Sequence, residues 1–247
     1  MDIENKPGQN IPKNHKATYT CPKCEHDQEF QHWDYVNAQL DPEMREKILD
    51  RVFYTQTCEE CGAVTQVLHS FMYHDMENQL LVYVVAESDP EKQAAEIEEI
   101  FELSDMSSTT EDEGLQVLLS SMKDNCTSRI VTSHQGLLEK IYISRNGLDD
   151  RLVEAMKVLY LSRLGDTIES KTLEGIYFDD VIDGGRKFVL DFADEGIATL
   201  DFDMDMYESL KDKMLDAFDA HTPQGFSIIN YFWALGVLSG SEPPAES

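Results

Sequence analysis

Two cysteine pairs of the form C-x-x-C constrain the fold of this chain more than any other feature. Cys21 and Cys24 form the first pair, Cys58 and Cys61 form the second, and 33 residues separate them. Two such pairs in a short region are the usual way to gather four thiolates around one metal ion, each pair forming a turn whose backbone N–H groups point at sulfur. Gly62 supplies the permissive backbone that such a turn often needs. We predict a closed, structural four-cysteine site.

Zinc is the predicted ion. Iron–sulfur spacings commonly place three cysteines close together, which this chain does not do. When sulfur fills all four positions, no place remains for a reactive water molecule. Two alternatives stay open for the pairs, a dithiol redox couple and two unrelated reduced pairs. His26 and His32 lie near the first pair, but four thiolates already complete the ligand set, so we expect these histidines on the surface or in hydrogen bonds.

The hydrophobic pattern predicts an α+β protein whose N-terminal domain is zinc-ribbon-like and carries an inserted helix. That helix starts at Asp41-Pro42, with aspartate as N-cap and proline at the first helical position. Alternation over 64–73 and the apolar run at 80–85 predict a β-hairpin. A very acidic helix follows Ser88-Asp89-Pro90 by the same capping argument. The predicted organisation is a tail at 1–17, the cysteine domain with its acidic helix at 18–106, a linker at 107–114 and a second domain at 115–247.

The second domain is predicted to contain helices followed by an antiparallel β-meander. A short strand at 129–131 precedes a helix capped by Ser133, and a second helix follows Asn146-Gly147. Three strands are expected at 176–182, 187–192 and 197–202, with a helix after them. The apolar run at 227–238 is shorter than the roughly 20 residues that span a bilayer. We therefore expect it in the core and expect no membrane association.

At these motifs the sequence resembles the CpXC domain family, which is named for its C-P-x-C motif. The resemblance covers about residues 19–143 and rests on Cys21-Pro22-Lys23-Cys24, the stretches 33–37 and 40–50, Cys58 to Gly62, the triplet Tyr73-His74-Asp75, and the segments 129–141 and 147–151. The family comprises bacterial proteins with a presumed zinc site and no established activity. The resemblance therefore implies a metal site and no reaction.

Charge narrows the possible partners. Lys and Arg total 20 and Asp and Glu total 48, which gives a formal net charge of −28. Phosphate-rich partners would be repelled, so we expect no nucleic-acid binding. The N-terminal residues contain neither a basic n-region nor an apolar h-region, which favours a cytoplasmic protein. Motifs for phosphate loops, dinucleotide binding and nucleophile elbows are absent from the sequence.

These observations favour a non-catalytic module that binds an as yet undefined protein partner. One alternative is an acidic decoy or immunity-type inhibitor of a basic protein. A lesser alternative is an enzyme with an unrecognised site.

Three weaker signals have structural explanations. His74 beside Asp75 is typical of an oriented general base, but no nucleophile motif accompanies the pair, so we expect hydrogen bonds that stabilise a turn. Cys126 lacks a strongly basic surrounding and is expected to be partly buried and inert. The acidic run from Asp201 to Asp205 resembles the start of an EF-hand loop, but Met206 stands where the loop needs glycine. A helix N-cap explains the run better.

Overall fold

The computed structural model describes residues 13–106, 126–168, 172–193 and 196–241. They fall into two compact units, within residues 1–134 and 135–247. The α+β class is confirmed, because the described residues form six α-helices and several antiparallel sheets. Among the described helices, none combines the length and apolar character needed to cross a membrane. The predicted linker at 107–114 lies outside the described residues.

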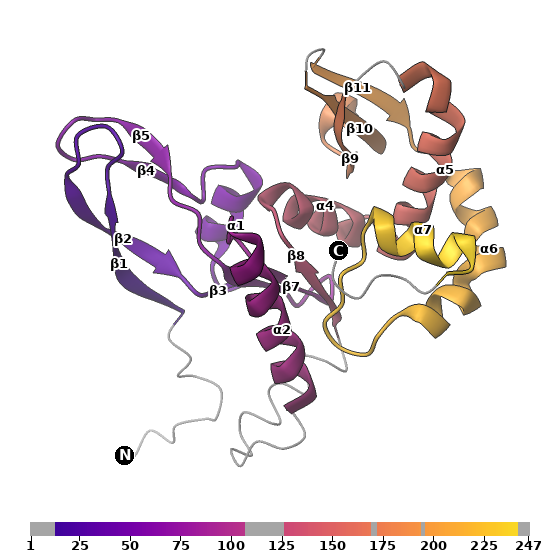
Figure 1. Cartoon of the computed structure of the whole chain (residues 1–247), viewed down its shortest axis with the longest axis horizontal. Coiled ribbons are helices and arrows are strands. Elements are labelled where there is room, and N and C mark those ends of the chain that lie inside the picture. The colour runs from indigo at the N-terminus through magenta and orange to yellow at the C-terminus, as the bar shows by residue number, and fades with distance from the viewer. Residues whose placement is uncertain (1–12, 107–125, 169–171, 194–195, 242–247) are drawn as a thin grey trace. The chain divides into compact units, whose positions relative to one another are not determined.

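Two antiparallel hairpins occupy one part of the first unit (Figure 1). The first joins β1 (Asn14–Thr20) to β2 (Asp27–Trp33), and the second joins β4 (Thr55–Thr57) to β5 (Val64–Gln66). β1 begins inside the segment expected to be a tail. Its seven residues bury only Tyr19, so backbone pairing with β2, rather than a hydrophobic period, defines this strand.

A mixed four-stranded sheet forms a second part of the first unit. Its strands are β3 (Tyr35–Asn37), β6 (Phe71–Asp75), β7 (Leu80–Val84) and β8 (Thr127–Val131), in the order β3-β6-β7-β8. β6 and β7 form the predicted hairpin. The single strand expected over 64–73 is instead two strands, because 64–66 pairs with β4. The strand expected at the start of the second domain is β8, but it pairs in parallel with β7 in the first unit.

Two helices complete the first unit, α1 (Pro42–Leu49) and α2 (Pro90–Met106). Both begin at the predicted Asp-Pro signals. The carboxylate of Asp89 accepts from the N–H groups of Glu91 and Lys92, as a cap should. The Asp41 side chain makes no cap. It accepts from the Asn37 N–H at 3.0 Å and pairs with Lys13 instead, so it fixes the approach to α1.

The second unit contains helices and a three-stranded meander. In chain order its elements are α4 (His134–Arg145), α5 (Asp150–Ile168), β9 (Leu173–Asp179), a short 3₁₀ turn (Ile182–Gly184), β10 (Lys187–Phe192), β11 (Gly196–Asp201), α6 (Met204–His221) and α7 (Tyr231–Ser239). The sheet order is β11-β10-β9, and both pairs are antiparallel, which confirms the predicted meander. The apolar run forms α7, which packs with α5 and α6 (Figure 1).

Asp203 is the N-cap of α6, and its carboxylate accepts from the Met206 N–H at 3.0 Å. This geometry confirms the helix-cap explanation of the acidic run and accounts for that aspartate without a calcium loop.

Candidate metal centre

The four cysteines of the two C-x-x-C pairs lie together at the tips of the two hairpins. Their sulfur atoms all lie within 4.8 Å of one another. The Sγ atoms of Cys21 and Cys61 are 3.8 Å apart, and those of Cys24 and Cys58 are 3.6 Å apart. Cys21 and Cys58 are buried, whereas Cys24 is exposed and Cys61 is partly exposed. Each pair therefore contributes one inner and one outer thiol.

The two tips share one backbone design. In the first, the Cys21 N–H donates to the His26 carbonyl, and the Glu25 N–H donates back to the Cys21 carbonyl. In the second, the Cys58 N–H donates to the Ala63 carbonyl, and the Gly62 N–H donates back to the Cys58 carbonyl. The residue four positions after the first cysteine has a positive φ in both turns, 59° at Glu25 and 67° at Gly62. The expectation for Gly62 is therefore confirmed.

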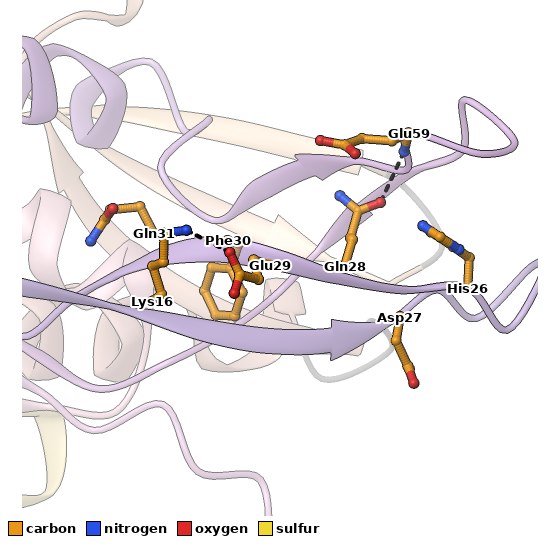
Figure 2. Close-up of a pocket in the computed structure, with 8 residues that line it drawn as sticks. All are labelled: Lys16, His26, Asp27, Gln28, Glu29, Phe30, Gln31 and Glu59. Atoms are coloured by element: carbon orange, nitrogen blue, oxygen red, sulfur yellow. Dashed lines mark hydrogen bonds and ion pairs between the residues drawn. The ribbon is translucent and has the colours of Figure 1, made fainter.

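The Gln28 side chain joins the two hairpins beside the cysteines. Its Nε2 donates to the Thr57 carbonyl at 3.1 Å, and its Oε1 accepts from the Glu59 N–H at 2.9 Å. Figure 2 shows this contact at the edge of a shallow polar pocket, where Lys16 and Glu29 form an exposed ion pair. One amide thus fixes the second cysteine turn against β2 by two hydrogen bonds.

The electrostatics of the cluster call for a cation. The N–H groups of Lys23 and Cys24 lower the pKa of the Cys21 thiol to about 6. The His26 N–H also favours a thiolate at Cys24, but the neighbouring sulfur atoms of Cys61, Cys58 and Cys21 outweigh it and raise the Cys24 pKa to about 12. Four thiolates this close cannot all be charged unless a positive ion lies among them. A divalent metal removes that conflict.

The sulfur positions fit such an ion. With a metal–sulfur distance of about 2.3 Å, the edge of a tetrahedron of four thiolates is about 3.8 Å. The two short Sγ–Sγ distances, 3.6 and 3.8 Å, have this length. A disulfide needs sulfur atoms about 2.0 Å apart, so the four thiols are not bridged, and their spacing suits metal ligands. The residues Cys21, Cys24, Cys58 and Cys61 can therefore hold one metal ion.

Comparison with known protein families matches residues 19–157 to the CpXC protein family. The match covers more than half of the chain and includes all four cysteines. The chain belongs to the CpXC family. No curated protein and no solved structure matches it.

In this CpXC protein neither histidine near the first pair is needed as a ligand. His26 supports the site through its backbone, since its carbonyl accepts from Cys21 and its N–H favours the Cys24 thiolate. His32 is at the other end of β2, with Nδ1 3.3 Å from an Asp34 carboxylate oxygen. Burial lowers the pKa of His32.

The triplet at the end of β6 stabilises the following turn through Asp75. Its carboxylate accepts from the N–H and side-chain amide of Asn78 and from the Gln39 side chain, at 2.7 to 3.1 Å. The buried His74 forms a hydrogen bond between its Nδ1 atom and the Tyr35 hydroxyl, 2.7 Å away. Its Nε2 lies 3.7 Å from the Cys126 sulfur, a pairing that the sequence did not predict.

The His74–Cys126 pair lacks the electrostatics of a nucleophile and its base. Burial raises the pKa of the Cys126 thiol and lowers the pKa of His74. Both groups are therefore held in their neutral forms at pH 7, whereas a reactive cysteine needs its thiolate.

A buried ion network between α4 and α5 is the largest polar feature that sequence reasoning missed. Lys140 contacts Asp150 at 2.9 Å, and Lys157 contacts Glu139 at 2.7 Å and Glu154 at 2.9 Å. All five side chains are at most 6% exposed. Other parts of the second unit also cover the network, since Lys140 Nζ donates to the Ile229 carbonyl and the Glu139 carboxylate accepts from the Phe178 N–H.

Proposed function

We propose that this CpXC protein binds one Zn²⁺ through Cys21, Cys24, Cys58 and Cys61, and that the two hairpins form a zinc-ribbon-like unit. The observation that carries the proposal is the match between the two short sulfur distances and the edge of a zinc–thiolate tetrahedron. Zinc is favoured over an iron–sulfur cluster because the cysteines come as two separated pairs. A reducing compartment such as the cytoplasm keeps the thiols available for the metal.

The proposed role is non-catalytic protein binding. A four-thiolate site leaves the metal no open position for water or substrate, so its contribution is to hold the hairpins. The second hairpin and the segment just after it present apolar surface. Val64 on β5 is 67% exposed, and Leu68 after β5 is 56% exposed. Exposed aliphatic side chains on a rigid, metal-fixed hairpin suit a protein partner. The net charge of −28 disfavours nucleic acid.

A crosslinking experiment in the source cell tests this role. Proteins captured by the wild type are compared with those captured by Val64→Ser/Leu68→Ser. The matched control is Val181→Ser, which replaces a valine of the second unit that is 59% exposed. We expect the double variant to keep its zinc and lose a specific partner, while the control retains it. If the two variants and the wild type capture the same proteins, the hairpin is not the docking surface.

A second candidate function is inhibition of a basic protein by an acidic surface. The observation that favours it is α2, where Glu91, Glu98, Glu99 and Glu102 are all exposed. Such a partner would be basic, and its association would weaken steeply with salt, because exposed charges are screened within about 10 Å at 0.1 M. In the same crosslinking experiment, this function predicts that a basic protein is captured by both the wild type and Val64→Ser/Leu68→Ser. Its capture should be lost at high salt.

A further inference from the structure

A second group of metal-ligating side chains lies at the base of the first hairpin. His15 on β1 and His32 on β2 are cross-strand partners, and Asp34 follows β2. The Nδ1 atoms of His15 and His32 lie 2.8 and 3.3 Å from the two oxygens of the Asp34 carboxylate. One ligand atom from each of the three residues can be chosen so that all lie within 4.8 Å. The three side chains come from separate positions that the hairpin register brings together.

A further histidine, His69, lies against this group through the His32 ring, although its nitrogen atoms are outside the set of ligand atoms within 4.8 Å of one another. Its ring is 4.2 Å from the His32 ring between centroids, and the His32 ring is 4.4 Å from that of His15. His69 is only 9% exposed. Its Nδ1 lies 3.1 Å from the Val67 carbonyl, which can only accept, so Nδ1 carries the proton and Nε2 presents a lone pair.

The lone pair of His69 has no assigned role. In the described part of the chain, the buried Nε2 of His69 has no hydrogen-bond partner, and the buried Nδ1 of His32 has none with good geometry. Buried polar atoms are nearly always satisfied, so two such nitrogen atoms in one cluster need an explanation. An imidazole whose other nitrogen donates to a backbone carbonyl is the usual form of a metal-bound histidine.

The surrounding structure holds these side chains in place. The Asp34 N–H donates to the Lys13 carbonyl at 3.0 Å, and the Asp34 carbonyl accepts from the Met72 N–H at 2.9 Å. The His69 ring packs against Phe53 and Tyr54, with centroids 5.5 and 5.2 Å away. Ligands fixed by backbone and aromatic packing need little ordering when an ion arrives.

We propose that His15, His32 and Asp34 form a second site for a divalent transition-metal ion, separate from the cysteine site, and that the Nε2 atom of His69 moves in as a fourth ligand when the ion binds. Imidazole and carboxylate donors suit zinc, nickel, cobalt or ferrous iron. Ligand distances of about 2.0 to 2.1 Å give octahedral to tetrahedral edges of about 2.8 to 3.4 Å, the range of the two nitrogen–oxygen contacts at Asp34. Five residues of β1 separate His15 from the cysteine turn, about 17 Å at strand rise, so one ion cannot serve both sites.

Cobalt titration of the tag-free protein tests the second site. The cysteine site is first loaded with one equivalent of zinc, and Co²⁺ is then added. We expect one equivalent of Co²⁺ to bind with the weak visible absorption of nitrogen and oxygen ligands and without thiolate-to-cobalt charge transfer. If no further Co²⁺ binds, or if it binds with thiolate charge transfer alone, the proposal is wrong.

Variants assign the ligands. Loss of a residue that only supports a metal site weakens binding roughly 10- to 100-fold, and His15→Ala/His32→Ala should weaken Co²⁺ binding by more than this. His69→Phe keeps a ring in the aromatic packing and should weaken Co²⁺ binding by at least about tenfold. His221→Ala removes an exposed histidine of α6 and should leave binding unchanged. Unaltered affinity in the double variant would overturn the proposal, and unaltered affinity in His69→Phe would remove the fourth ligand on which it rests.

Asp34→Asn protects the test against misfolding. Its side chain is 43% exposed and its backbone contacts are unchanged by the substitution, so the fold and the first zinc equivalent should be retained. We expect this variant to lose at least about tenfold in Co²⁺ affinity, because a neutral amide is a poorer ligand than a carboxylate. Wild-type affinity in a folded Asp34→Asn protein would contradict the site.

Discussion

Cysteine residues occupy two opposite environments in this protein. At Cys21, the N–H groups of Lys23 and Cys24 stabilise a thiolate, as a metal ligand requires. At Cys126, burial and the nearby charge of Asp75 stabilise the neutral thiol. The C-x-x-C spacing predicted the first environment. The contact between Cys126 and His74 was not predictable, because 52 residues separate them and β8 must pair with β7 to bring them together.

The raised pKa of Cys126 predicts slow alkylation. The thiolate is the reactive species, and a pKa above the ordinary 9.0 lowers its fraction at every pH below that value. With the other four cysteines bound to zinc, iodoacetamide should modify Cys126 more slowly than it modifies a free cysteine peptide at pH 7.5. The rate should keep rising with pH past pH 9 before it levels off, as measured by mass spectrometry. A rate that reaches its plateau below pH 8 would identify an activated nucleophile.

The elements of the cysteine site illustrate what local sequence can specify. The two turns were predictable because a C-x-x-C pair has a preferred backbone geometry, and Gly62 after the second pair supports it. The break between β5 and β6 was not predictable from the alternating pattern over 64–73. That pattern is continuous, and only the pairing of 64–66 with β4 shows that this segment belongs to the second hairpin. Gln28 was missed for a similar reason, since a lone glutamine on a strand carries no signal.

The shared geometry of the two turns predicts that substitutions at their left-handed positions, Glu25 and Gly62, affect stability differently. Open space surrounds the place that a Cβ atom would take at Gly62, so Gly62→Ala introduces only the cost of a left-handed residue, about 1 to 2 kcal/mol. Glu25 already bears that cost, and Glu25→Gly should not lower the free energy of unfolding. Thermal denaturation of the zinc-loaded proteins measures both. Equal stabilities for Gly62→Ala and wild type would contradict the strain at this turn.

The helix pair α4–α5 carries a second prediction at this scale. Lys157→Met leaves Glu139 and Glu154 buried without their nearest cation, and breaking a buried pair in this way costs about 3 to 5 kcal/mol. The matched control is Lys187→Met, whose partner Asp201 is 91% exposed, and it should cost at most about 1 kcal/mol. Chemical denaturation should separate the two variants clearly. Similar losses would show that the network contributes no more than a surface pair.

At the scale of the whole molecule, the protein combines two compact units, and we expect their stability to come from different sources. The first unit buries much of its apolar surface in one mixed sheet, and its two hairpins extend to the cysteine site. The second unit has a core built from α5, α7 and the meander, with Leu152, Val153 and Phe178 fully buried. Composition and periodicity predicted the α+β class and the meander. The assignment of β8 to the first unit needed the fold, because a parallel strand partner is distant in sequence.

Limited proteolysis tests how the metal and the two units are related. Loss of zinc in Cys58→Ser/Cys61→Ser removes binding free energy of order 10 kcal/mol from the first unit, so protease should cut it. The second unit should survive as a fragment. A fragment that starts near residue 135 would agree with the boundary between the two compact units. A fragment that starts near residue 115 would agree with the linker predicted from the sequence. Cys126→Ser, which removes no proposed ligand, should stay as resistant as wild type.

A different outcome would change the view of the whole chain. If Cys58→Ser/Cys61→Ser is degraded throughout and leaves no fragment, the two units share their stability. The same conclusion would follow if the chain unfolds in a single cooperative step with and without zinc.

Zinc X-ray absorption on protein loaded with one equivalent tests the central claim most directly. Four sulfur atoms at about 2.3 Å should surround the ion, because the four cysteine sulfur atoms lie within 4.8 Å of one another and two of their separations match the edge of a zinc–thiolate tetrahedron. The sulfur shell should be lost or incomplete in Cys58→Ser/Cys61→Ser and unchanged in Cys126→Ser. A first shell of nitrogen or oxygen atoms, or fewer than four sulfur atoms in the wild type, would contradict the four-cysteine zinc site.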